Sequence, residues 1–106
     1  MSEWMRVSID APPAEGSMTT VSVLGRRLIL FRTASGYFAT DRRCTHQGAD
    51  LARGYFDQDV IECPVHQGRF SIRTGEALSA PACVALKVYP VKSTSDGVYV
   101  QIDAST

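Results

Sequence analysis

The stretches Cys44-Thr45-His46-Gln47-Gly48 and Cys63-Pro64-Val65-His66-Gln67-Gly68 are the most informative part of this sequence. Each contains one cysteine and one histidine, and together they contain both histidines of the chain. Thiolates and imidazoles are metal ligands, and their clustering in two short segments indicates a metal site. The four candidate ligands are Cys44, His46, Cys63 and His66. Because Gln-Gly follows each histidine, we expect both segments to be loops in which glycine allows close approach to a ligand.

Two kinds of metal centre use two thiolates and two imidazoles. Zinc occupies many structural Cys₂His₂ sites, but those sites pair two cysteines in one loop and two histidines on a helix. Here each loop mixes the ligand types, and a single residue separates Cys44 from His46, which is tight for two ligands of one tetrahedral ion. A dinuclear [2Fe-2S] cluster suits the pattern better, because Cys44 can bind one iron and His46 the other. A structural zinc module is the alternative.

Cysteine and histidine are also common without a metal. A lone cysteine is usually a small buried hydrophobe, and a lone histidine is usually a hydrogen-bonding surface residue. A catalytic Cys-His pair is a further alternative, but its duplication has no use in nucleophilic catalysis. The clustering of four such residues therefore favours a metal site. Cys83 is left over, and we interpret it as a buried or loop thiol.

The composition indicates one domain spanning residues 1–106. Lys and Arg number 11 and Asp and Glu number 11, so no strong field of one sign favours a nucleic acid or an anionic membrane as partner. The first residues lack the basic and apolar regions of a signal peptide, and no apolar run approaches the ~18–20 residues of a membrane span. Three cysteines do not fit a secreted disulfide scaffold. We therefore expect a cytoplasmic protein.

Short β-rich segments separated by turn residues predict an all-β sandwich or barrel. Residues 20–24 alternate apolar and polar side chains, a turn signal follows at Gly25-Arg26, and the apolar run 28–31 completes an expected hairpin. Asp96-Gly97 predicts another hairpin turn. No window has the apolar periodicity of a helix. The strands are expected at about 20–24, 28–31, 37–39, 60–63, 69–72, 86–89 and 98–102, with a connecting loop or short strand within 49–59.

The two motifs resemble the cluster-binding boxes of the Rieske family. Over nearly its whole length the chain is similar to the small Rieske-type ferredoxins of bacterial aromatic-ring-hydroxylating dioxygenases. The resemblance implies an antiparallel β sandwich with a small inserted cluster-binding subdomain at about 42–73. It also implies one Rieske-type [2Fe-2S] cluster per chain, covered by a proline-containing loop for which Ser79-Ala80-Pro81-Ala82 is the candidate. Cys44 and Cys63 would then bind the inner iron, and His46 and His66 would bind the outer iron.

Departures from high-potential respiratory Rieske proteins indicate a low reduction potential. Those proteins have a further disulfide-bonded cysteine in each box, where this chain has Ala49 and Val65, and hydroxyl donors where it has Gly68 and Phe70. Fewer donors to the cluster sulfurs mean less stabilisation of the added electron. We expect a potential toward the low end of the class range of roughly −150 to +300 mV. Gln67 stands where many relatives have glycine.

The resemblance implies an electron carrier and not an enzyme. Such a ferredoxin passes single electrons from an NAD(P)H-dependent flavin-containing reductase to a terminal Rieske non-haem iron oxygenase in the dioxygenation of aromatic compounds. The alternative is the small Rieske-like subunit of a nitrite reductase, although those relatives often lack the ligands present here. The charged residues around the boxes are interpreted as a mostly solvated mixed surface, with partner docking as a hypothesis for one or two arginines. These arginines are Arg42, Arg43, Arg53, Arg69 and Arg73.

Overall fold

Antiparallel β-strands make up most of the computed structural model, which describes residues 2–45, 48–65, 67–79 and 84–103. The strands are β1 (Ser2–Arg6), β2 (Met18–Val23), β3 (Arg26–Thr33), β4 (Gly36–Asp41), β5 (Tyr55–Asp57), β6 (Val60–Glu62), β7 (Arg69–Ser71), β8 (Ala77–Ser79), β9 (Val88–Tyr89), β10 (Val91–Thr94) and β11 (Gly97–Asp103). One 3₁₀ turn, η1 (Leu51–Arg53), is the only helical element within the described ranges. No helix among these residues is long and apolar enough to cross a membrane.

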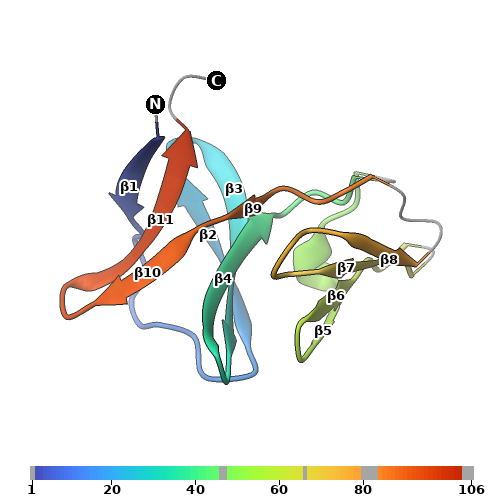
Figure 1. Cartoon of the computed structure of the whole chain (residues 1–106), viewed down its shortest axis with the longest axis horizontal. Helices are drawn as coiled ribbons and strands as arrows, with labels where there is room; N and C mark the ends of the chain where they lie inside the picture. The colour runs from blue at the N-terminus through green and yellow to red at the C-terminus, as the bar shows by residue number, and fades with distance from the viewer. Residues whose placement is uncertain (1, 46–47, 66, 80–83, 104–106) are drawn as a thin grey trace.

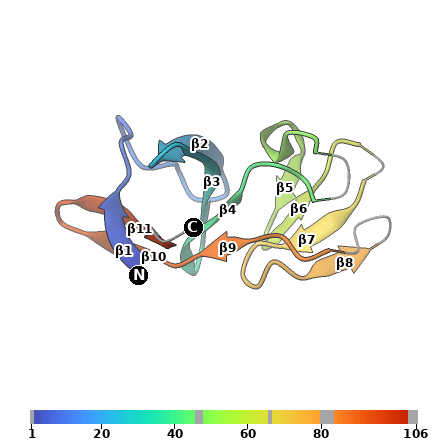
Figure 2. The same cartoon turned by 90° about the horizontal axis from the view of Figure 1, so that it is seen from above.

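The strands form three sheets arranged as a base and a smaller lobe (Figure 1). The base consists of the sheets β1-β11-β10 and β2-β3-β4-β9, whose inner faces share one hydrophobic core. The lobe contains the sheet β5-β6-β7-β8, which lies beside the base and not within it (Figure 2). This arrangement confirms the predicted antiparallel sandwich with an inserted smaller part.

The lobe is an insertion between two paired strands of the base. β4 and β9 are hydrogen-bonded neighbours, with Ala39 opposite Tyr89 and Thr40 opposite Val88. The chain therefore leaves the base at the end of β4 and returns beside the same strand. The lobe sheet includes β8, which follows the expected end of the subdomain at residue 73.

The central strand β3 contributes to two cores. Leu28 and Leu30 pack into the core of the base, whereas Ile29 and Phe31 pack into the core of the lobe. All four side chains have 0% exposure. A strand that is buried on both faces needs apolar residues at successive positions, which explains the uninterrupted run at 28–31.

Arg73 links the lobe to the base. Its Nε donates to Asp59 Oδ2 at 2.9 Å within the lobe, and its Nη2 donates to Ser35 Oγ at 2.5 Å in the turn between β3 and β4. Its guanidinium also lies over the ring of Phe38 on β4, 4.9 Å from the centroid. These contacts and the shared strand β3 hold the lobe in one orientation on the base.

Both predicted hairpins are present, with turns one residue earlier than expected. Val23 pairs with Arg26, so Leu24 and Gly25 form the turn between β2 and β3, with φ of 50° and 78°. Two successive positive φ values match the twist of the adjoining strands. The turn between β10 and β11 likewise precedes Gly97, which pairs with Thr94.

Candidate metal centre

The first ligand segment forms a closed loop between β4 and η1. The backbone N–H of Cys44 donates to the carbonyl of Ala49 at 2.8 Å, and that of Gly48 donates to Cys44 at 2.9 Å. The N–H of Leu51 donates to the carbonyl of Arg42 at 2.8 Å and closes the base of the loop. Gly48 has a φ of 70°, which is the unusual backbone conformation expected for this glycine.

The second ligand segment connects β6 and β7 and repeats the same closure. The N–H of Cys63 donates to the carbonyl of Gly68 at 2.7 Å. In both loops the cysteine therefore bonds to the fifth residue after it, as Cys44 bonds to Ala49. The similarity of the two sequence motifs corresponds to a shared backbone arrangement.

An arginine–carboxylate pair joins the two chain segments that flank each ligand loop, which we call the neck of the loop. Arg42 donates to both carboxylate oxygens of Asp50 at 2.8 Å, and Arg69 donates to Glu62 at 2.9 Å. Asp50 also accepts from the N–H of Ala52 at 3.0 Å and thereby caps η1. Arg42, Arg69 and Arg73 therefore have specific ion-pair partners, while the side chains of Arg69 and Arg73 remain 58% and 46% exposed.

The two described cysteines meet inside the core of the lobe. The side chains of Cys44 and Cys63 are 2% and 1% exposed, are free thiols, and contact each other. They share this core with Leu51, Ile61 and Phe70. Burial raises the pKa of the Cys63 thiol, and the neighbouring Cys44 adds to the increase, while a hydrogen bond from the backbone of Val65 opposes it.

Paired thiols in such an apolar setting fit a metal centre. A buried thiolate needs a compensating positive charge, and a metal ion supplies it while it takes the place of the protons. The structure thus brings together the two predicted sulfur ligands. His46, His66 and Cys83 lie outside the described residues, as does most of the expected proline-containing loop.

The family comparison decides between the candidate metals. The model of the Rieske [2Fe-2S] domain family matches residues 3–90, which include both ligand loops and the whole lobe. The chain belongs to the Rieske [2Fe-2S] family. This confirms the predicted family and its cofactor, a Rieske-type [2Fe-2S] cluster.

Relatives of similar length are ferredoxins of dioxygenase systems. The chain is 40% identical over 103 residues, 97% of each sequence, to the ferredoxin component of the naphthalene 1,2-dioxygenase system of Pseudomonas putida. It is 39% identical over 94 residues, 88% of this chain and 85% of the relative, to the biphenyl dioxygenase ferredoxin subunit of Pseudomonas sp. strain KKS102. A solved complex of reduced oxygenase and oxidised ferredoxin of carbazole 1,9a-dioxygenase contains a chain that is 37% identical, with a TM-score of 0.82 and coverage of 92% and 91%. This Rieske protein is thus an electron carrier of the ferredoxin type.

The sequence motifs of this Rieske protein did not reveal the role of Thr45. Its hydroxyl donates to the carbonyl of Val84 at 2.8 Å and connects the first ligand loop with the segment that leads to β9. The partner is distant in sequence, so no local signal indicates the bond. The hydroxyl therefore helps to hold the first loop in place.

Gln67 adopts a φ of 60° directly after His66, in the second ligand loop. In this left-handed conformation a Cβ causes steric strain, which glycine does not have. We expect Gln67→Gly to increase the free energy of unfolding by about 0.5–1 kcal/mol in denaturant titrations. Gln101→Gly in β11 is the matched control and should lower it by about as much. A loss of stability in Gln67→Gly would contradict this account.

Asp50 gives the Rieske protein a pH-dependent contribution to stability. The hydrogen bonds from Arg42 lower the pKa of Asp50 to about 2, against the opposing effect of burial. Because the pKa of the folded state is depressed, the contribution is complete above the unfolded value near 3.8 and disappears as the pH falls through about 2. We expect Asp50→Asn to lose about 1 kcal/mol of unfolding free energy at pH 7, measured by denaturant titration.

The difference between the wild type and Asp50→Asn should narrow progressively from about pH 4 toward pH 2. Glu62→Gln is the control because it removes the more exposed pair with Arg69, whose side chain is 58% exposed. Its effect should stay within about 0.5 kcal/mol. A pH-independent effect of Asp50→Asn would show that the ion pair does not contribute in this way.

Proposed function

We propose that this chain carries single electrons in an aromatic-compound dioxygenase system. The electron donor is an NAD(P)H-dependent flavin-containing ferredoxin reductase, and the acceptor is a terminal Rieske non-haem iron oxygenase. The observation that carries the proposal is the 40% identity to the naphthalene dioxygenase ferredoxin over 97% of both sequences. The proposal places the protein in the cytoplasm, where such a reductase has access to its nucleotide.

The proposal assigns the cluster to four ligands on a single domain spanning residues 1–106. Cys44 and Cys63 bind the inner iron, and His46 and His66 bind the outer iron. Burial of both cysteines in one core and their contact with each other support the thiolate half of this assignment. The cluster-binding subdomain is the lobe, beginning at about residue 42.

The chain positions the cluster but supplies no substrate chemistry. When bound, the [2Fe-2S] cluster accepts and releases one electron. The backbone hydrogen bonds of Cys44 and Cys63 hold their thiolates in place, and the apolar core around them excludes water. Phe70 is fully buried in that core and provides no hydroxyl donor, which supports the proposed low potential.

Reconstitution tests the proposed function. The purified holoprotein is combined with the reductase and oxygenase of a naphthalene or carbazole dioxygenase system, and NADH oxidation and product formation are followed. We expect turnover that depends on this protein and saturates with its concentration. Absence of turnover with each of these systems, despite a full cluster, would contradict the proposal. A colourless protein that contains zinc and no acid-labile sulfide would contradict the cluster itself.

A further inference from the structure

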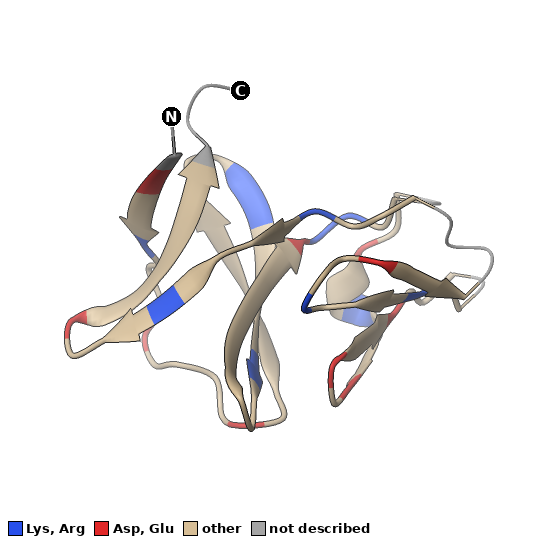
Figure 3. Cartoon of the chain, viewed as in Figure 1, with Lys and Arg blue, Asp and Glu red and all other residues tan. Residues whose placement is uncertain are grey.

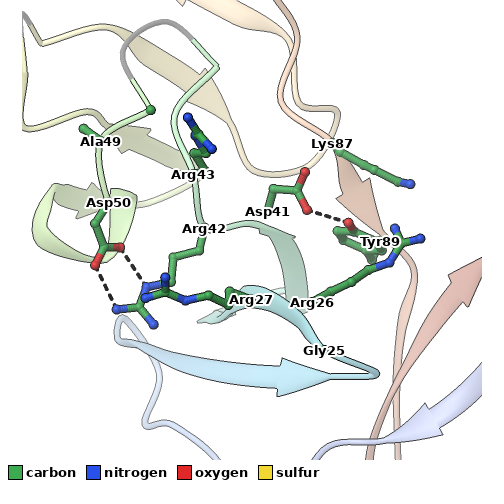
Figure 4. A pocket seen from close by; sticks show the side chains of 11 residues that line it. Gly25, Arg26, Arg27, Asp41, Arg42, Arg43, Ala49, Asp50, Lys87 and Tyr89 are labelled. Carbon is green, nitrogen blue, oxygen red and sulfur yellow. Dashed lines mark hydrogen bonds and ion pairs between the residues drawn. The ribbon is translucent and has the colours of Figure 1, made fainter. Parts of the chain in front are cut away.

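A basic pocket of about 680 Å³ lies between the base and the first ligand loop (Figure 4). Five cationic side chains line it, against two carboxylates, Asp41 and Asp50. The cations are Arg26, Arg27, Arg42, Arg43 and Lys87. They come from the start of β3 and from the two chain segments that join the base to the lobe (Figure 3). This local excess of positive charge contrasts with the balance of 11 basic and 11 acidic residues in the whole chain.

Both carboxylates of the basic pocket are already engaged. Asp50 binds Arg42 through both of its oxygens, and Asp41 accepts a hydrogen bond from the hydroxyl of Tyr89. That hydroxyl keeps its proton, because burial and the neighbouring Asp41 raise the pKa of Tyr89 to about 12. Asp41 keeps its negative charge beside the neutral hydroxyl, so the two carboxylates offset two of the five cations and leave an excess of positive charge.

Three cations remain available to an incoming anion. Within the described ranges, Arg27, Arg43 and Lys87 form no ion pair with a carboxylate, although the charge of Arg27 contributes to the lowered pKa of Asp50. Lys87 has its ammonium 5.3 Å from the ring centroid of Tyr89, which positions it without neutralising its charge. Arginine pairs with carboxylates through two parallel hydrogen bonds, so this set is suited to carboxylate groups.

The basic pocket adjoins the loop that carries Cys44. Arg43 directly precedes this cysteine, and its guanidinium packs so closely on Gly48 that a Cβ at the glycine would lie 2.9 Å from Nε. An acidic group bound here would therefore sit beside the first ligand loop. Electron transfer requires a partner to approach the cluster, and complementary charge next to it increases the rate and specificity of encounter.

We propose that the basic pocket is a docking site for an acidic surface of a redox partner protein, whose carboxylates bind Arg27, Arg43 and Lys87. This inference rests on the proposed function, because the partner is one of the two proteins that exchange electrons with the chain. Of the five arginines that the sequence analysis considered for partner docking, only Arg43 belongs to this set. Arg27 and Lys87 are new candidates. The pocket volume accommodates several carboxylates at once, as a protein surface presents them.

The test compares two double variants with the same change in net charge. Arg27→Gln/Lys87→Gln removes two cations of the basic pocket, and Arg6→Gln/Lys92→Gln removes two from the separate sheet β1-β11-β10. Both holoproteins must have the far-ultraviolet circular dichroism and visible absorption of the wild type. Calorimetric titration with hexa-aspartate at low salt should show about tenfold weaker binding to the pocket variant only.

The second measurement uses the reductase and oxygenase that reconstitute turnover. The pocket variant should need about tenfold more ferredoxin for half-maximal rate with one of them at low salt, with an unchanged maximal rate and a weaker dependence on salt. If both double variants need equally more ferredoxin for half-maximal rate, net charge and not the basic pocket is responsible, and the docking site is overturned. Binding of inorganic phosphate as tight as that of hexa-aspartate, without any kinetic effect of the variant, would overturn it in favour of a small-anion site.

Failure of the proposed function is distinguishable from failure of this inference. If no reductase and oxygenase pair gives turnover, the proposed function is overturned, while the titration with hexa-aspartate still reports on the basic pocket. If turnover occurs and the pocket variant behaves as the control variant does in both measurements, the docking site alone is overturned.

Discussion

Cys63→Ser is expected to abolish cluster binding, and Cys44→Ser is expected to do the same. A serine hydroxyl is a poor replacement for a thiolate on iron, because soft sulfur ligands select iron–sulfur clusters. The side chain of Cys63 is 1% exposed in an apolar core, so water does not readily take its place as a ligand. Visible absorption, iron and acid-labile sulfide of each purified variant should fall from a full cluster to background.

Cys83→Ser is the matched control, since Cys83 is the third cysteine of the chain. It should retain the full iron and sulfide content and the visible spectrum of the wild type. An intact cluster in Cys63→Ser would remove this residue from the ligand set. Loss of the cluster in Cys83→Ser would instead assign Cys83 as a ligand.

Gly75→Ala is expected to destabilise the lobe severely. Gly75 has a φ of 80°, and a Cβ at this position would lie 1.9 Å from the carbonyl oxygen of Leu86. The two residues cannot separate freely, because the N–H of Leu86 donates to Gly75 at 2.7 Å and the N–H of Gly75 donates to Ser71 at 2.8 Å. We expect a loss of about 3 kcal/mol or more in denaturant unfolding followed by circular dichroism. That is a large share of the ~5–15 kcal/mol by which a small domain is stable.

Gly16→Ala separates the steric clash from backbone strain. Gly16 has a similar φ of 84°, but a Cβ there would have no heavy atom within 4 Å. Its substitution should therefore cost only the backbone strain, about 1–2 kcal/mol. Equal losses in the two variants would show that the contact with Leu86 is not the cause.

The sequence allowed the strands with strong apolar patterns to be predicted, but not the weakly patterned ones. The run at 28–31 and the alternation at 98–102 lie within β3 and β11, as expected. β1 and β10 were missed because they contain few apolar residues and owe their conformation to pairing with β11 on either side. β8 was missed because it is short and pairs with β7 through an irregular register.

The sequence singled out Cys44 and Cys63, which the structure brings together, but it did not reveal the contacts that support their loops. The repeated motif with a cysteine and a glycine indicated two similar loops, and their shared backbone closure agrees with this. The necks were not predictable, because several carboxylates lie near each arginine in the sequence and only folding selects Asp50 for Arg42. The basic pocket was equally hidden, since Arg27 and Lys87 come from segments that meet only through the pairing of β3 with β4 and of β4 with β9.

The insertion of the lobe between two paired strands has a consequence for the order of folding. Pairing of β4 with β9 joins positions 39–40 to 88–89 and closes a loop that contains the entire lobe. Closing so long a loop in a flexible chain costs entropy before its contacts form, which slows folding. A lobe that is already folded brings its two ends together and reduces that cost. We therefore expect the lobe to fold before or together with the pairing of β4 and β9. The base, which contains both ends of the chain, is then completed last.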